Sequence, residues 1–66
     1  MLSYKILGRR LLDSQLEAVD VEWSSPALPA PVPDQINVSP GTSVEGIVMI
    51  LESKRPRLAE NLGIEP

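Results

Sequence analysis

The sequence contains no cysteine, no histidine and no phenylalanine. Without cysteine the chain can form neither a disulfide nor a thiolate metal site. Without histidine it lacks the commonest transition-metal ligand and the commonest general base. Tyr4 and Trp23 are the only aromatic residues, so the core must consist mainly of leucine, isoleucine and valine side chains.

The chain is also short, with 66 residues and a net charge of −3. Domains below roughly 70–80 residues usually depend on disulfides, a metal or a partner. Because no disulfide can form and metal ligands are scarce, we expect association with other proteins, including further copies of this chain, to support the fold. The acidic balance argues against a nucleic-acid partner, since such binders usually carry a basic surplus.

Long hydrophobic runs are missing as well. The longest unbroken apolar run covers residues 47–51, whereas a membrane-spanning helix needs about 20 apolar residues. The N-terminus has no apolar stretch of signal-peptide length. The sequence therefore predicts neither a membrane span nor a signal peptide, and a cytoplasmic or virion location is the simplest expectation.

The first 23 residues carry the pattern of strands. In residues 2–6 and 19–23 apolar and polar side chains alternate, which is typical of half-buried antiparallel strands. Residues 13–15 are a plausible turn between them, and Gly8 fits a bulge. A helix competes, because leucines in this region also recur every three or four residues. The β-branched and aromatic residues of 19–23 favour a hairpin over residues 1–23.

Proline is abundant in the middle of the chain, at positions 26, 29, 31 and 33. Each proline fixes φ and removes a backbone donor, so neither a helix nor a central strand is expected there. The sequence predicts a proline-rich extended arm over residues 24–40 in polyproline II geometry, with a short strand at residues 36–38. Residues 26–29 also match the minimal PxxP pattern that aromatic grooves bind, while a plain spacer is the simpler interpretation.

The last part of the chain, residues 41–66, is predicted to be helical. Thr42 and Glu45 form a capping box, and apolar residues follow at the i, i+3, i+4, i+7 spacing of one helix face: Val44, Ile47, Val48 and Leu51. Pro56 is expected to end or kink this helix and to open a second one, which Gly63 would cap. A fully buried strand over residues 46–51 remains the alternative.

These segments together predict a small α+β domain with an N-terminal β-hairpin, a proline-rich extended arm and one or two short C-terminal helices.

Residues 36–47, continued by Leu51 and residues 56–58, resemble the strand–turn–helix start of ubiquitin-like sulfur carriers. The same stretch resembles the opening of a LysM glycan-binding module. Sulfur carriers act through a C-terminal Gly-Gly tail, whereas this chain ends in Gly-Ile-Glu-Pro, so that activity does not carry over.

Residues that could carry catalysis are few. The hairpin holds four carboxylates, at Asp13, Glu17, Asp20 and Glu22, but acid–base work needs one of them buried with a shifted pKa. Their spacing matches no EF-hand loop, and the glycines match no nucleotide-binding fingerprint. The sequence therefore predicts a protein that is not an enzyme and that holds no metal or cofactor.

The features left over point to protein contacts. Trp23 stands where the hairpin meets the arm, apolar residues lie among the prolines, and the sequence Lys-Arg-Pro-Arg at 54–57 is the one basic cluster. The candidate protein-binding residues are Trp23, Leu28, Pro29, Pro31, Val32, Arg55 and Arg57. We expect a non-catalytic structural or accessory subunit that docks through its arm into a larger assembly, such as a phage virion, a tail-like machine or a multisubunit complex. The alternative is an autonomous binding module, β-grasp-like or LysM-like, for a protein or glycan.

Overall fold

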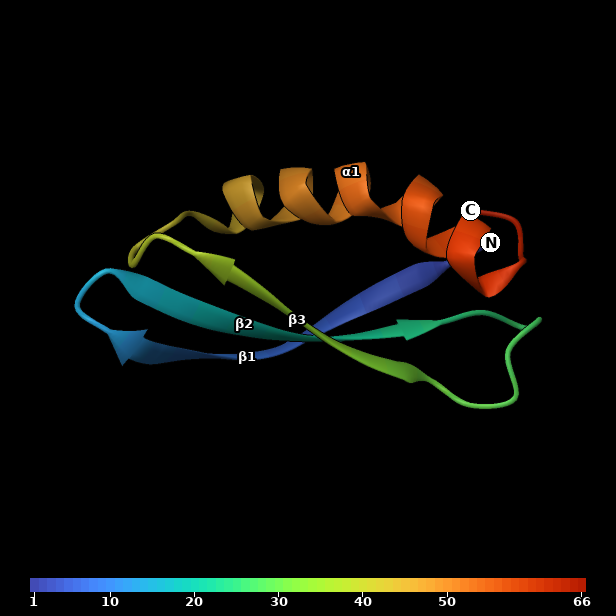
Figure 1. Cartoon of the computed structure of the whole chain (residues 1–66), viewed down its shortest axis with the longest axis horizontal. Coiled ribbons are helices and arrows are strands. Elements are labelled where there is room, and N and C mark those ends of the chain that lie inside the picture. The colour runs from blue at the N-terminus through green and yellow to red at the C-terminus, as the bar shows by residue number, and fades with distance from the viewer.

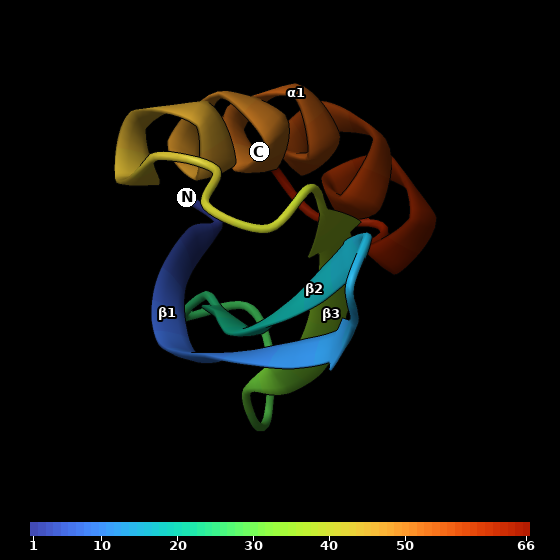
Figure 2. The same cartoon turned by 90° about the vertical axis from the view of Figure 1, so that its left-hand side faces the viewer.

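A computed structural model, which describes all 66 residues, places three strands beneath one helix (Figure 1). The strands are β1 (Ser3–Asp13), β2 (Leu16–Ser24) and β3 (Val32–Val38), and the helix is α1 (Val44–Leu62). The sheet is antiparallel with the order β1-β2-β3. The helix covers one face of this twisted sheet and leaves the other face open (Figure 2). The predicted small α+β class is confirmed.

The hairpin formed by β1 and β2 follows the sequence pattern. The turn between the strands is stabilised by the Asp13 carboxylate, which accepts a hydrogen bond from the Gln15 backbone N–H at 2.7 Å. The pairing register shifts between Ile6 and Gly8 and again between Leu11 and Asp13. Gly8 therefore lies at a bulge, as predicted, and β1 contains two irregular positions.

The extended arm expected over residues 24–40 is not seen. Residues 25–31 form a short loop, and residues 32–38 form β3, paired along its length with β2. The expected strand at residues 36–38 is therefore part of a longer one. A proline at position 33 is tolerated because β3 is an edge strand, one side of which needs no hydrogen-bond partner.

The helical interpretation of residues 44–52 is confirmed, but the helix begins one residue later than the predicted capping box. Ser43 is the N-cap, and its hydroxyl accepts a hydrogen bond from the Gly46 N–H at 3.1 Å. The Thr42 hydroxyl instead donates to the Ser39 carbonyl at 2.6 Å and closes the preceding turn. Both residue types satisfy backbone groups near a helix start, so the sequence alone places the cap only to within one residue.

Of the one or two C-terminal helices expected, the structure contains one, so Pro56 does not end the helix. Pro56 lies inside a single helix that continues to Leu62. The second half of α1 buries Ala59 completely and packs Leu58 and Leu62 against the core. This burial outweighs the one backbone hydrogen bond that the proline removes. The helix does not combine the length and the apolar character that a membrane crossing would require.

The core lies between α1 and the face of the sheet that it covers. Trp23, Val19 and Val21 of β2 are buried there, as their alternation predicts. Buried residues from the other elements complete the cluster: Leu2, Ile36, Val38, Ile47, Leu51 and Ala59. Only 10 of the 66 residues are buried, so each of these side chains carries a large share of the stability.

Truncation of Leu51 tests this core. Leu51 is fully buried, whereas Met49, two residues away on α1, is 72% exposed. We expect Leu51→Ala to lower the free energy of unfolding by about 2–5 kcal/mol, because it removes buried methyl groups and leaves a cavity. Met49→Ala is the matched control and should change it by less than about 0.5 kcal/mol. Urea denaturation followed by circular dichroism measures both, and equal effects would contradict this core.

Candidate interaction site

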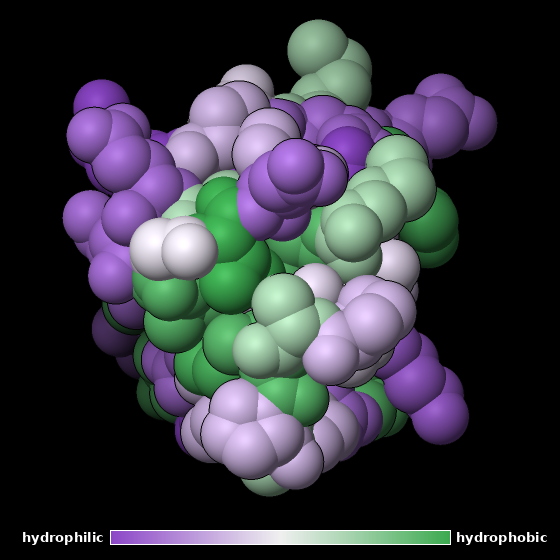
Figure 3. Space-filling model, turned by 90° about the vertical axis from the view of Figure 1, so that its right-hand side faces the viewer, coloured by the Kyte–Doolittle hydropathy of each residue, from purple (hydrophilic) through white to green (hydrophobic).

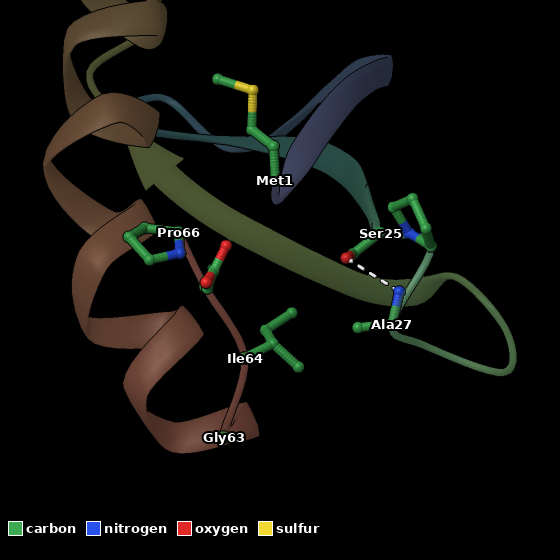
Figure 4. Close-up of a pocket in the computed structure, with 8 residues that line it drawn as sticks. Met1, Ser25, Ala27, Gly63, Ile64 and Pro66 are labelled. Carbon is green, nitrogen blue, oxygen red and sulfur yellow. Dashed lines mark hydrogen bonds between the residues drawn. The ribbon is translucent and has the colours of Figure 1, made fainter.

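The largest hollow in the molecule lies at the end where the β2–β3 loop meets both chain termini. Its volume is about 590 Å³, and it is lined by Met1, Ser25, Pro26, Ala27, Gly63, Ile64, Glu65 and Pro66. Apolar side chains gather on this end of the surface (Figure 3). The lining comes from three segments that are far apart in the sequence (Figure 4).

The β2–β3 loop is held in place by a turn and by one anchor. The Leu28 N–H donates to the Ser25 carbonyl at 3.0 Å, and the Ala27 N–H donates to the Ser25 hydroxyl at 3.2 Å. This is a β-turn with Pro26 at its second position, where proline is favoured because its φ is already correct. Leu28 then packs against the core. The turn therefore presents Pro26 and Ala27 to the hollow as an ordered wall.

The opposite wall is set by the end of α1. Gly63 has φ +71° and ψ +30°, the left-handed conformation, and thus caps the helix as predicted. The Gly63 N–H donates to the Glu60 carbonyl at 3.1 Å, and the Ile64 N–H donates to the Ala59 carbonyl at 3.0 Å. These two bonds define a Schellman motif, in which the residue after the glycine turns back toward the helix. Ile64 accordingly packs against the core while it lines the hollow.

Most of the side chains that line this hollow are uncharged. Glu65 is its only charged side chain, and Ser25 contributes its only side-chain hydroxyl. In the whole chain no three acidic side chains come close enough together to hold a metal ion. The site offers a largely apolar surface with one charged side chain, Glu65, at its rim.

Two of the candidate residues in the proline-rich segment point inward and two outward. Leu28 and Val32 are partly buried and pack against the core. Pro29 and Pro31 are exposed at the tip of the loop. The apolar side chains of this segment therefore anchor the loop to its own domain, and only the prolines are free for a partner.

Trp23 lies in the core and not on a surface. Its side chain is fully buried, and its indole N–H donates to the Asp34 carboxylate at 3.0 Å. The same carboxylate forms an ion pair with the Lys54 ammonium at 2.7 Å. Asp34 therefore links β2, β3 and α1 in one contact. Trp23 is therefore a core anchor, and its buried side chain offers no surface to a partner.

The electrostatics of Asp34 follow from these contacts. Burial by itself raises the pKa of its carboxyl, but three donors oppose this effect: the Lys54 ammonium, the Trp23 indole and the Gln35 backbone N–H. Their combined effect is larger, so the pKa lies below its ordinary value. The charged form is therefore the one that the folded protein stabilises.

The basic cluster at residues 54–57 is largely used within the domain. Arg55 forms an ion pair with Glu52 and lies over the Tyr4 ring, 5.5 Å from its centre. Its Nε is buried without a hydrogen-bond partner. Burial first, and then the nearby Glu52 charge, raise the pKa of Tyr4. Of the two candidate arginines only Arg57 is exposed and free of an ion pair.

A second surface runs along β1, the strand at one edge of the sheet. Its two arginines are turned toward acids of β2, because Arg9 pairs with Glu17 and Arg10 pairs with Asp20 at 3.1 Å. The hydrogen bond from Arg9 lowers the pKa of Glu17. The leucines of the same strand are exposed: Leu7 by 55%, Leu11 by 64% and Leu12 by 44%.

Sequence reasoning missed most of the residues that line the hollow. Met1, Ser25, Ala27 and Ile64 carry no motif of their own, and their proximity depends on the complete fold. One signal was available for Ile64, because an apolar residue after a C-cap glycine commonly packs back on the helix.

Comparison of the chain with protein-family models, with curated proteins and with solved structures gives no match. The comparisons therefore add no support to either resemblance in residues 36–47.

The role of Asp34 can be tested by pH. We expect Asp34→Asn to lower the free energy of unfolding by about 1–2 kcal/mol at pH 7, because the ion pair is lost while an acceptor for the indole remains. The contribution of the carboxylate is present above its unfolded pKa, about 3.9, and is lost as the pH falls through the lower folded value. The difference from the unaltered chain should therefore shrink between pH 5 and pH 2.

Urea denaturation at a series of pH values measures this difference. Asp20→Asn is the matched control, because the Asp20 side chain is 37% exposed and pairs only with surface groups. It should change the stability by less than Asp34→Asn does. A constant difference between Asp34→Asn and the unaltered chain down to pH 2 would contradict the role assigned to Asp34.

Proposed function

We propose that this chain is a non-catalytic accessory subunit that docks on another protein of a larger assembly through the end formed by its proline-rich loop. The observation that carries the proposal is the hollow lined by Pro26, Ala27 and Ile64, beside the exposed Pro29 and Pro31. An apolar hollow next to rigid, exposed loop residues is typical of binding surfaces. The mode of docking differs from the expected free arm, since the loop is already ordered on its own domain.

The chemistry of the hollow indicates what would fill it. Glu65 is the only charged side chain on its rim, and the chain as a whole carries a net charge of −3. The complementary partner is a protein that inserts an apolar side chain and places a lysine or arginine beside Glu65. The loop prolines support this docking, because a segment with restricted φ loses little conformational entropy on binding.

One observation favours the alternative, an autonomous binding module. Leu28 and Val32 tie the proline-rich segment to the core of the same chain, as expected for a surface loop of a self-sufficient domain. The accessible surface is 4375 Å², close to the roughly 4100 Å² of a folded monomer of this mass. Both aromatic rings lie in or against the core, so such a module would bind through aliphatic and proline side chains.

A charge placed in the hollow tests the proposed docking. Ala27 lines the hollow, whereas Ala30 is exposed on the same loop outside it. We expect Ala27→Lys to abolish the stoichiometric co-purification of a partner from cells that make the chain, because the new cation repels the partner's own. Ala30→Lys is the matched control and should retain the partner. Native mass spectrometry of the purified complexes gives the stoichiometry.

The charge at the rim provides a second variant. Glu65→Gln should weaken the partner's affinity by roughly tenfold or less, the effect of one exposed ion pair, whereas Glu60→Gln on α1 should not. Co-purification that survives Ala27→Lys, or the absence of any stoichiometric partner, would contradict docking at this end. Protection of the loop near Leu28 from proteases in the isolated chain, without a partner, would favour the module.

A further inference from the structure

The outer edge of β1 has no hydrogen-bond partner. β1 pairs only with β2, and it is the longest strand of the sheet, with 11 residues. Every second residue of an edge strand directs its N–H and C=O groups outward, which makes such an edge a template for another strand. The exposed Leu7, Leu11 and Leu12 lie on this strand.

The opposite edge of the sheet is a poorer template. β3 has 7 residues and contains Pro33, which has no N–H to donate to a further strand. β1 contains no proline. Only the β1 edge of the sheet can therefore accept a further strand. Two copies that pair through this edge form a closed dimer with two-fold symmetry, not a fibre.

Charges on an edge strand usually prevent such pairing, but two of the four charged residues on β1 are neutralised within the domain. Arg9 and Arg10 are paired with acids of β2. Lys5 and Asp13, near the two ends of the strand, are its only charged residues without an ion pair. One unpaired cation and one unpaired anion at opposite ends make the strand complementary to an antiparallel copy of itself.

The faces of β1 define the register of such a pair. Residues opposite each other in antiparallel strands share a face, so Ile6 and Leu11 lie on the helix-covered side, opposite Val21 and Glu17. Lys5 and Asp13 lie on the open side, opposite Glu22 and Leu16. A two-fold register that preserves both sides keeps Leu7 and Leu12 as bulges, as in the pairing with β2, and centres on Arg9 opposite the partner's Arg9. It places Ile6 opposite the partner's Leu11 and Lys5 opposite the partner's Asp13.

We propose that two copies of this chain associate through antiparallel pairing of β1 with β1, which forms a six-stranded sheet with both helices on the same face. Each dimer then contains two contacts between Ile6 and Leu11 and two ion pairs between Lys5 and Asp13. A standard interface buries about 800 Å² per partner, less than a fifth of the 4375 Å² surface of this chain. An extended strand of 11 residues, at about 3.3 Å per residue, gives this edge a length of roughly 36 Å.

Charge reversal tests the register. Lys5→Glu places two acids opposite each other at both ends of the dimer interface, and Asp13→Lys places two cations there. Each variant alone should have a dimer dissociation constant roughly tenfold or more above that of the unaltered chain. An equimolar mixture of the two should form a heterodimer with affinity restored, because both of its end contacts are then between opposite charges. Sedimentation equilibrium measures all three, with circular dichroism to confirm folding.

A second pair of variants keeps the test valid if Asp13→Lys disturbs the hairpin turn. Leu11→Gln removes the apolar contact with Ile6 and should weaken the dimer roughly tenfold, whereas Met49→Gln, on the outward side of α1, should leave it unchanged. A chain that stays monomeric at millimolar concentration overturns the proposal. So does a dimer that neither Leu11→Gln nor the charge reversals weaken, since it must then use another surface. Neither result bears on the docking of a partner at the proline-rich loop.

Discussion

The carboxylate of Asp34 is the polar contact on which the core of this domain depends. A buried indole N–H needs an acceptor, and Asp34 supplies it to Trp23 while it also binds Lys54. The Trp23 ring in turn lies 5.3 Å from the Tyr4 ring, and the Tyr4 hydroxyl donates to Glu52 on α1. The helix is thus tied to both edge strands by polar contacts that flank the apolar core. With no disulfide or metal available, these contacts fix how α1 lies across the sheet.

The sequence predicts the parts of this fold that are decided locally. The alternation of apolar and polar residues predicts the hairpin and its buried face, Gly8 predicts the bulge, and Gly63 predicts the end of the helix. Each of these features depends on the conformation of a few neighbouring residues. The link between Trp23 and Asp34 could not be predicted, because it exists only when β3 pairs with β2 in the observed register. A helix end at Pro56 does not occur for a related reason. The proline removes one backbone hydrogen bond from the helix, but the packing of the second half of α1 outweighs that loss.

The proline-rich segment shows where local rules fail. Four prolines argue against a central strand, and β3 is an edge strand, but it begins at Val32 and not at the predicted residue 36, and Val32 packs against the core. Leu28 and Val32, whose spacing among the prolines suggests contacts with a neighbour, anchor the segment to its own domain. The hollow at this end was invisible in the sequence for the same reason. Three distant segments form its walls, and only tertiary structure brings them together.

A sheet covered on one face leaves its edges and ends available for contacts, and here the two candidate surfaces are separate. The proline-rich loop follows the end of β2 that pairs with the start of β1, since Ser24 lies opposite Ser3. Leu11 and Asp13 lie near the other end of β1, beside the hairpin turn (Figure 1). In an antiparallel β1–β1 pair the two loops would therefore lie at opposite ends of the six-stranded sheet. Such a dimer would present two identical docking ends, and an assembly with repeated partners would bind it more tightly than it binds either end alone, because the second contact becomes intramolecular.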